Sequence, residues 1–393
     1  MVGLGPLSEH GTYTDAVSGP LEGLKVLELA GIGPSPYACM LLADLGADVL
    51  RLERGDADAE ATTTWDVLNR SRHSVAIDLK SEAGRDLVLE LCEQADVLIE
   101  GFRPGVTEHL GLGPEDVWRR NRRLVYGRMT GYGQEGPLAS RAGHDINYVG
   151  VSGALWPVGR AGERPVPPLN FVGDFGGGAL FLVFGVMSAL FSAQRSGEGQ
   201  VVDVAMVDGS ASMTAMTHSL MNRGYWLEER GVNILDTGAH FYDVYETKDQ
   251  RYVAVGAIEA KFYAELLRGL GLSATELPSQ MDRAQWPAMK EKFTAIFLEK
   301  TRDEWTEIFR DVDACVTPVL SPSEAAQHPY NTARRVFSLD GAVQPEPAPR
   351  FSKTPGAVSQ PPRAAGSGTR EGLRNWGVSE ERLAALAEAG AFG

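Results

Sequence analysis

An imidazole and a carboxylate, each with glycine neighbours, mark the part of the chain where chemistry is expected. His144 lies in the run Gly143-His144-Asp145-Ile146-Asn147-Tyr148, and Asp174 lies in the later stretch 170–178, which ends in three consecutive glycines. Both stretches are mostly apolar and carry little charge. Proton transfer by two side chains needs one acid/base group on each side of the reacting atom, and His and Asp can both serve. We therefore take His144 and Asp174 as a candidate two-base site.

Local sequence suggests how these residues are placed. Residues 145–148 can begin a helix, so a backbone N–H such as that of Asp145 would point at a ligand oxygen beside the imidazole. Each residue also has a structural interpretation. A His is often an ordinary surface group, and Asp174 is equally well placed to cap the helix that follows it. Glu259, after a predicted strand, is otherwise an ordinary acid at a helix start.

Composition limits the classes of function. A chain of 393 residues with 43% apolar and 23% charged residues is typical of a globular protein of two or three domains. The net charge of −15 argues against a nucleic-acid partner. Cys39, Cys92 and Cys315 are scattered and lack the spacing of metal ligands, so we expect no metal and a reducing compartment. The start of the chain does not resemble a signal peptide, and a cytoplasmic location is expected.

One uncharged segment, 175–194, is about as long as a membrane span of roughly twenty residues. Asp174 precedes it, glycines occupy its start, and the sequence shows no second such span. We interpret the segment as a central buried helix and expect no contact with a membrane.

Alternating segments of apolar strand and amphipathic helix open the chain. Such a βαβ pattern predicts an α/β fold whose large domain holds a doubly wound, Rossmann-like parallel sheet. The predicted strands are 24–30, 47–53, 74–79, 97–102 and 123–129, and the predicted helices are 37–45, 82–94 and 114–120.

After about residue 200 the regular alternation of strands and helices is no longer predicted. A long helix rich in Met and Ser is expected from about residue 201, followed by short strands at 242–246 and 252–255 and, near the end, a helix at 380–388. Pro, Ala, Gly and Ser dominate 344–372, which indicates an extended strap. We therefore expect a flexible extension at 1–20, a large domain at 21–224, a smaller α+β domain at 225–325, and a strap and helix at 326–393 that return to the large domain.

Two features in the first domain are open to a nucleotide-binding interpretation. The loop Gly31-Ile32-Gly33-Pro34-Ser35-Pro36 partly fits a dinucleotide fingerprint, but Pro36 replaces the third glycine, which favours a tight turn that begins a helix. Basic residues near the predicted strand ends form a possible anion site or an ordinary charged surface: Arg51, Arg54, Arg70, Arg72, Lys80 and Arg103.

Several long motifs resemble those of the alpha-methylacyl-CoA racemases, a branch of the class III CoA-transferase family. The resemblance runs from about residue 21 to at least residue 319. Its motifs are Glu28-Leu29-Ala30-Gly31-Ile32-Gly33-Pro34, Asp44-Leu45-Gly46-Ala47-Asp48-Val49, Ile99-Glu100-Gly101-Phe102-Arg103-Pro104-Gly105, residues 143–148, residues 164–178 and residues 253–259.

This resemblance implies a 1,1-proton transfer at the α-carbon of a 2-methylacyl-CoA, through an enolate. His144 and Asp174 would be the two bases, with Glu259 paired to His144, Asn170 supporting Asp174 and the Asp145 N–H donating to the enolate oxygen. No separate cofactor is implied, because CoA is part of the substrate. The acyl chain itself stays open.

By the same resemblance, CoA would lie along the large domain, with Arg54 at its adenosine phosphate end. The other implied contacts are Ile32, Ala76, Leu79, Lys80, Arg103 and Met129 along CoA and Tyr148 and Tyr242 at the acyl end. His109 stands where an arginine is expected, which weakens one phosphate contact. The resemblance also implies an interlocked homodimer with its active site at the subunit interface.

Two alternative functions remain. Class III CoA transferases share the implied fold and use the aspartate at the Asp174 position as a nucleophile. Racemisation is favoured because His144 supplies a second base, and because residues 256–259 replace the glycine-rich loop of the transferases. The other alternative is an NAD-binding reductase or a non-catalytic nucleotide-binding protein. Only the opening βαβ unit supports this hypothesis.

Overall fold

The structure is a computed structural model that describes residues 19–55, 66–339 and 342–392. Residues 1–18 of the expected N-terminal extension lie outside this range. Two compact units are present: unit 1 holds the chain up to Ser152, Leu169–Met213 and the chain from Arg335, and unit 2 holds Gly153–Pro168 and Thr214–Arg334.

The units differ from the expected ranges in three segments, because residues 153–168, 214–224 and 326–334 all belong to unit 2. Residues 153–168 group with unit 2, because Trp156 donates a hydrogen bond to the Glu228 carbonyl (2.6 Å) and Arg160 pairs with Asp243 (3.0 Å). Such long-range pairs leave no periodic signal in the sequence.

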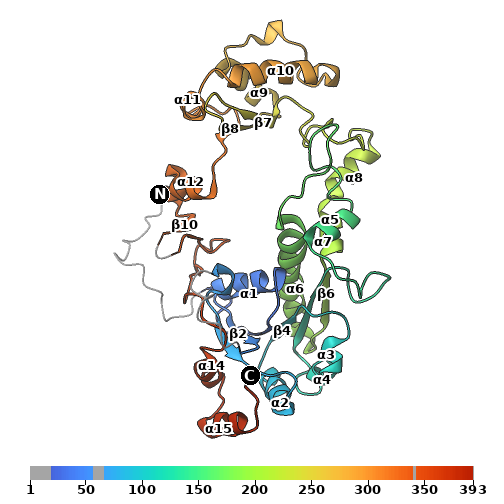
Figure 1. The fold of residues 1–393 in the computed structure, drawn as a ribbon, viewed down its shortest axis with the longest axis vertical. Helices are drawn as coiled ribbons and strands as arrows, with labels where there is room; N and C mark the ends of the chain where they lie inside the picture. Colours follow the sequence, from blue (N-terminus) through green and yellow to red (C-terminus); the bar gives the residue numbers. More distant parts are fainter. Residues whose placement is uncertain (1–18, 56–65, 340–341, 393) are drawn as a thin grey trace. The chain divides into compact units, whose positions relative to one another are not determined.

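A parallel six-stranded sheet lies at the centre of unit 1, and Figure 1 shows its strands with helices beside them. The strands follow the order β3-β2-β1-β4-β5-β6, so the winding reverses between β1 and β4. This confirms the predicted α/β class with a parallel sheet. The strands are β1 (Lys25–Leu29), β2 (Asp48–Glu53), β3 (His73–Ala76), β4 (Val97–Glu100), β5 (Val125–Thr130) and β6 (Val201–Ala205).

Strand β6 corrects the expectation of a long helix from residue 201. Val201–Ala205 pairs in parallel with β5, from Tyr126 opposite Val201 to Thr130 opposite Ala205. Its β-branched residues suit a strand. The helical residues that follow begin only at Met206, in α7 (Met206–Met213) and α8 (Ala215–Asn222).

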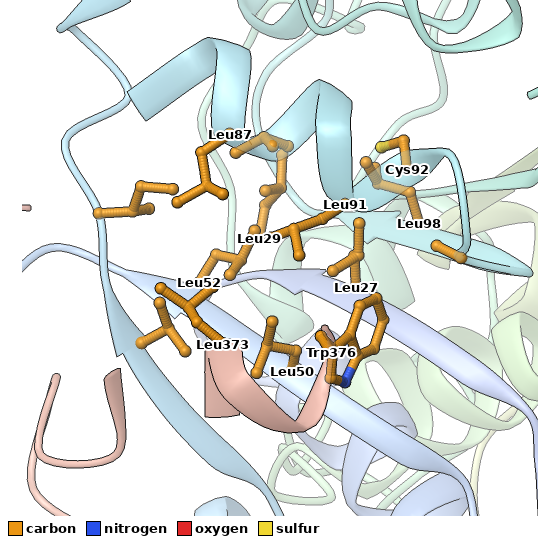
Figure 2. Close-up of a cluster of buried hydrophobic side chains, with 14 of the residues drawn as sticks. Leu27, Leu29, Leu50, Leu52, Leu87, Leu91, Cys92, Leu98, Leu373 and Trp376 are labelled. Atoms are coloured by element: carbon orange, nitrogen blue, oxygen red, sulfur yellow. The ribbon is translucent and has the colours of Figure 1, made fainter. Parts of the chain in front are cut away.

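Side chains of successive strand residues point to opposite faces of the sheet, and each face has its own apolar core. On one face, Leu27 and Leu29 of β1 pack with Leu87 and Leu91 of α2 (Glu82–Cys92), as Figure 2 shows. Trp376, the residue directly after α14 (Thr369–Asn375), packs in the same cluster.

The other face is covered by α1 (Pro34–Asp44) and α6 (Phe181–Ser196). Val26 of β1 packs there with Leu42 of α1 and Leu182 of α6. The remaining elements of unit 1 are short: a 3-10 turn (Val67–Asn69), α3 (Val106–His109), α4 (Pro114–Trp118), α5 (Asp145–Val151), the π-helix (Phe171–Leu180), β10 (Phe337–Ser338), β11 (Gln344–Pro345) and α15 (Glu380–Glu388).

The helical stretch Phe171–Ser196 is long and apolar enough to cross a membrane by length and composition alone. The expectation that it is centrally buried is wrong for part of its surface. Its sheet side, with Leu182 and Val186, is buried, but Leu180, Phe184 and Phe191 are 50%, 73% and 63% exposed. These three residues lie on one face of the helix, which is largely exposed.

Unit 2 contains a small antiparallel sheet in the order β7-β8-β9. The predicted strands at 242–246 and 252–255 are confirmed as β7 (Tyr242–Glu246) and β8 (Tyr252–Gly256), and β9 (Val316–Pro318) joins them. One face of the sheet packs on α9 (Ala260–Gly269), α10 (Trp286–Phe297) and α11 (Arg302–Ile308). The other helical segments are Ala274–Glu276, Arg283–Gln285, α12 (Pro322–Gln327) and α13 (Pro329–Arg334).

Candidate active site

A cavity of about 510 Å³ opens at the carboxyl ends of the strands of unit 1. Its walls come from the segments Ile32–Ser35 after β1 and Gly101–Pro104 after β4, and from residues 129–132 at the end of β5. These are the strands on either side of the point where the winding of the sheet reverses, where ligands of open α/β sheets bind. His144, Tyr148 and Asp174 also line this cavity.

His144 occupies the N-cap position of α5. Its backbone N–H donates to Asn147 Oδ1 (3.0 Å), and its side chain is exposed. The Asp145 N–H is at the first helical position, where the helix itself offers no acceptor. The predicted hydrogen bond from this N–H to an enolate oxygen stays a prediction.

Tyr148 fixes the turn before His144. Its hydroxyl donates to the carbonyl of Gly143, and its ring packs edge-on against Tyr132 (5.0 Å between centroids). Burial, together with the neighbouring Tyr132 and the carboxylates Asp174 and Asp145, raises the pKa of Tyr148 to about 12. The phenol therefore stays protonated near neutral pH and acts as a hydrogen-bond donor.

Asp174 lies inside the π-helix, so the N-cap interpretation of this residue is wrong. Asn170 holds the N-cap position instead, and its Nδ2 donates to Asp174 Oδ2 at 3.4 Å. Half-burial raises the pKa of the Asp174 carboxyl, the Asp145 charge raises it further, and Asn170 and His144 oppose the shift. A raised pKa brings the carboxyl nearer to the range in which one group can both accept and donate a proton.

The glycines after Asp174 let the π-helix approach α7 closely. A Cβ at Gly177 would lie 2.6 Å from the backbone nitrogen of Ser210, which is closer than real Cβ contacts. α7 in turn presents Gly209 to the backbone of Gly177. The three-glycine run is thus a packing feature that holds the segment bearing Asp174.

The glycine-containing loop after β1 is a tight turn, and α1 begins at Pro34, earlier than the predicted residue 37. Gly33 has φ of +73°, which favours glycine. Its Cα faces Asp174, since an added Cβ would lie 3.2 Å from Asp174 Oδ2. The loop therefore forms part of the wall around the carboxylate.

The structure gathers some of the predicted CoA contacts at one edge of the sheet. Ile32, Arg103, Met129 and Tyr148 line the cavity. Arg54 follows β2, Ala76 ends β3, and Leu79 and Lys80 follow β3, at the same carboxyl edge but outside the cavity lining. Tyr242 begins β7 and Glu259 is the N-cap residue of α9, both in unit 2, so their roles stay predictions.

Three of the basic residues considered for an anion site are engaged inside the protein. Arg70 is 1% exposed and pairs with Asp44 (2.6 Å), and Arg72 is 1% exposed and pairs with Glu28. Arg51 contacts Glu53 (3.0 Å). The anion-site interpretation is wrong for the two buried residues. Arg54, Lys80 and Arg103 have exposed side chains, whereas His109 ends the short helix α3 and is also exposed.

Several cavity residues were not predicted as site residues from the sequence, among them Tyr132 and Met206. Tyr132 follows β5, and Met206 follows β6. The β-branched valines of Val201–Ala205 were the available signal for Met206, because recognising that strand would have placed its carboxyl end at the cavity.

The fold and cavity define a Rossmann-like α/β protein with a ligand site at the reversal of its sheet. The chain belongs to the CoA-transferase family III, whose family model matches residues 21–369. It is 48% identical to alpha-methylacyl-CoA racemase of Mus musculus over 93% of this chain and 96% of that protein, and 44% identical to the Homo sapiens racemase over 92% and 95%. The fold matches a CAIB/BAIF family protein from Brucella suis with a TM-score of 0.79, 24% identity, and coverage of 91% of this chain and 100% of that one.

Proposed function

We propose that this protein racemises the α-carbon of 2-methylacyl-CoA thioesters. The observation that carries the proposal is that an imidazole, His144, and a carboxyl with a raised pKa, Asp174, line one cavity at the reversal of the sheet. The two mammalian racemases, similar over nearly the whole chain, support the reaction and the substrate class.

The proposed reaction uses the two side chains as complementary acid and base. One removes the α-proton and leaves the electron pair in an enolate thioester, and the other returns a proton to the opposite face. The Asp145 N–H would donate to the enolate oxygen as its charge develops. An imidazole is by its type a suitable general acid or base, whereas Asp174 depends on half-burial and on the Asp145 charge, which both raise its pKa.

CoA would lie along the carboxyl edge of the sheet. Arg103 lines the cavity, and Arg54 and Lys80 are exposed basic side chains at the same edge of an acidic protein. We propose that these three residues hold phosphate groups and that the remaining predicted contacts border the pantetheine and acyl parts. The expected cytoplasmic location is proposed with this function.

The deciding experiment is α-proton exchange. The protein is incubated with (S)- and (R)-2-methylacyl-CoA separately in deuterated buffer, and the products are followed by NMR and chiral analysis. Deuterium at the α-carbon with loss of stereochemical purity is the expected result. If label does not enter and CoA instead moves to an added carboxylate, Asp174 acts as a nucleophile and the protein is a CoA transferase.

We further propose a homodimer in which Glu259 of one subunit meets His144 of the other. The exposed apolar face of Leu180, Phe184 and Phe191 supports it, because such a face is typical of an interface. Co-expression of His144→Ala with Glu259→Gln tests the arrangement, since a mixed dimer would contain one site with both native residues. Recovery of racemisation in the mixture, with neither variant active alone, is expected. No recovery in an isolated mixed dimer would place both residues in one subunit.

A further inference from the structure

The Asp145 side chain joins the two segments that carry the proposed bases. Asp145 directly follows His144 in the chain, and its Oδ2 accepts a hydrogen bond of 2.7 Å from the backbone N–H of Asp174. One carboxylate therefore ties the start of α5 to the middle of the π-helix. The bond is charge-assisted, a class that is about twice as strong as a neutral hydrogen bond.

The neighbouring residue leaves room for this contact. An added Cβ at Gly173 would lie 2.6 Å from Asp145 Oδ2, so any larger residue there would displace the carboxylate or the π-helix. Glycine at this position is thus required by the approach of Asp145.

The carboxylate is buried with little compensation. Asp145 is 6% exposed, and its Oδ1 has no hydrogen-bond partner among the described residues. A buried, poorly compensated polar group destabilises a fold, and its presence calls for a functional reason. Here the charge faces Asp174 and raises the pKa of that carboxyl.

We propose that the Asp145 side chain is a positioning residue, which sets the separation of His144 and Asp174 by binding the Asp174 backbone. This inference goes beyond the enolate contact expected of the Asp145 backbone, and it rests on the proposed racemisation. A second consequence is electrostatic: its negative charge keeps the neighbouring carboxyl closer to the range needed for proton exchange.

Three variants separate geometry from charge. Asp145→Ala removes the acceptor and the charge, Asp145→Asn keeps an acceptor oxygen without the charge, and Gly173→Ala keeps the charge but displaces it. Asp96→Asn is the matched control, because Asp96 Oδ2 also accepts one backbone N–H (from Lys25, 2.9 Å) but lies before β4, at the opposite edge of the sheet. The readouts are kcat and KM with each enantiomer, and binding of free CoA.

We expect Asp145→Ala and Gly173→Ala to lower kcat about 100-fold with each enantiomer, because a misplacement of about 1 Å has an effect of this size. The affinity for free CoA should stay within about twofold of that of the native protein, because neither substitution removes a proposed CoA contact. Asp145→Asn should recover part of this loss. Asp96→Asn should leave kcat unchanged. Native kcat in Asp145→Ala, or a loss of CoA binding equal to the loss of kcat, would overturn the proposal.

The pH profile tests the electrostatic part. Asp174 is faced by His144, Asp145 and Tyr148 from the α5 segment, by Asn170 from its own segment, and by the uncharged Gly33 from the turn before α1. Removing the Asp145 charge lowers the pKa of Asp174. With the enantiomer whose α-proton Asp174 removes, the acidic limb of the pH profile of kcat should therefore move to lower pH. If the acidic limb of the pH profile does not move in Asp145→Asn, the proposed electrostatic effect of Asp145 on Asp174 is wrong.

Loss of the proposed racemase activity and loss of the proposed positioning role would give different experimental results. If the native protein transfers CoA and does not exchange α-protons, racemisation is wrong, and the transfer rate then becomes the readout because Asp174 is still the reacting group. Slower transfer in Asp145→Ala would support positioning, and transfer at the native rate would overturn it.

Discussion

His144 lies at the exposed start of a short helix, whereas Asp174 lies in a half-buried π-helix whose glycines pack against α7. The difference follows from the two side chains. An imidazole can act as a general acid or base by its type alone, so an exposed position suffices. A carboxyl needs desolvation to bring its pKa towards neutral pH, and desolvation requires tight packing. We therefore expect the segment that carries His144 and the segment that carries Asp174 to respond differently to substitution.

The largest effects should come from the bases themselves. His144→Ala should remove α-proton exchange with one enantiomer, and Asp174→Asn with the other, because each base faces one side of the α-carbon. Both variants should lose racemisation by about 10²- to 10⁴-fold, the usual contribution of a general acid or base. The measurement is enantiomer-resolved deuterium exchange, with CoA binding as the control for folding. Full racemisation in either variant would show that the second base lies elsewhere.

A smaller effect is expected on stability, and on the Asp174 side alone. Gly177→Ala places a Cβ 2.6 Å from the Ser210 nitrogen and should destabilise the protein by about 1–3 kcal/mol through overpacking. Ile146→Ala, at a 43% exposed position of α5, should change stability by no more than about 0.5 kcal/mol. Thermal unfolding compares the two variants, and equal shifts would remove the proposed contrast.

The smallest effect is expected from Tyr148 on the His144 side. Tyr148→Phe removes the hydrogen bond to the Gly143 carbonyl and keeps the ring contact with Tyr132. Loss of one such bond is worth about 0.5–1.5 kcal/mol, so exchange by His144 should slow by no more than about tenfold. Exchange by Asp174, measured with the other enantiomer, is the internal control. A larger loss of α-proton exchange by Asp174 than by His144 would show that Tyr148 acts on Asp174.

Local patterns predicted much of the fold. Strands β1 to β5 and helix α2 lie close to their expected positions, because apolar periodicity reports them directly. β6 was missed because its short run is followed at once by the helical residues from Met206. The segment 175–194 was correctly expected to be helical, but composition alone does not show which of its faces a neighbour covers.

The sequence predicted the proposed bases of the site better than its anion-binding residues. His144 and Asp174 stood out by residue type and glycine context, and the structure brings both to one cavity. Arg70 and Arg72, in contrast, resembled anion ligands until their buried partners Asp44 and Glu28 were located. Those partners are distant in the sequence, and no local pattern reports such a pair.

The sequence by itself determined the α/β class, most of the strands, the chemical types of the proposed bases and the motifs shared with the family, because backbone periodicity and residue chemistry are local properties. Only the tertiary structure decided that the segments after β1, β4 and β5 meet around His144 and Asp174, and that Asp145 binds the Asp174 N–H. The physical reason is that these contacts depend on the order of strands in the sheet and on the close approach that Gly33, Gly173 and Gly177 allow.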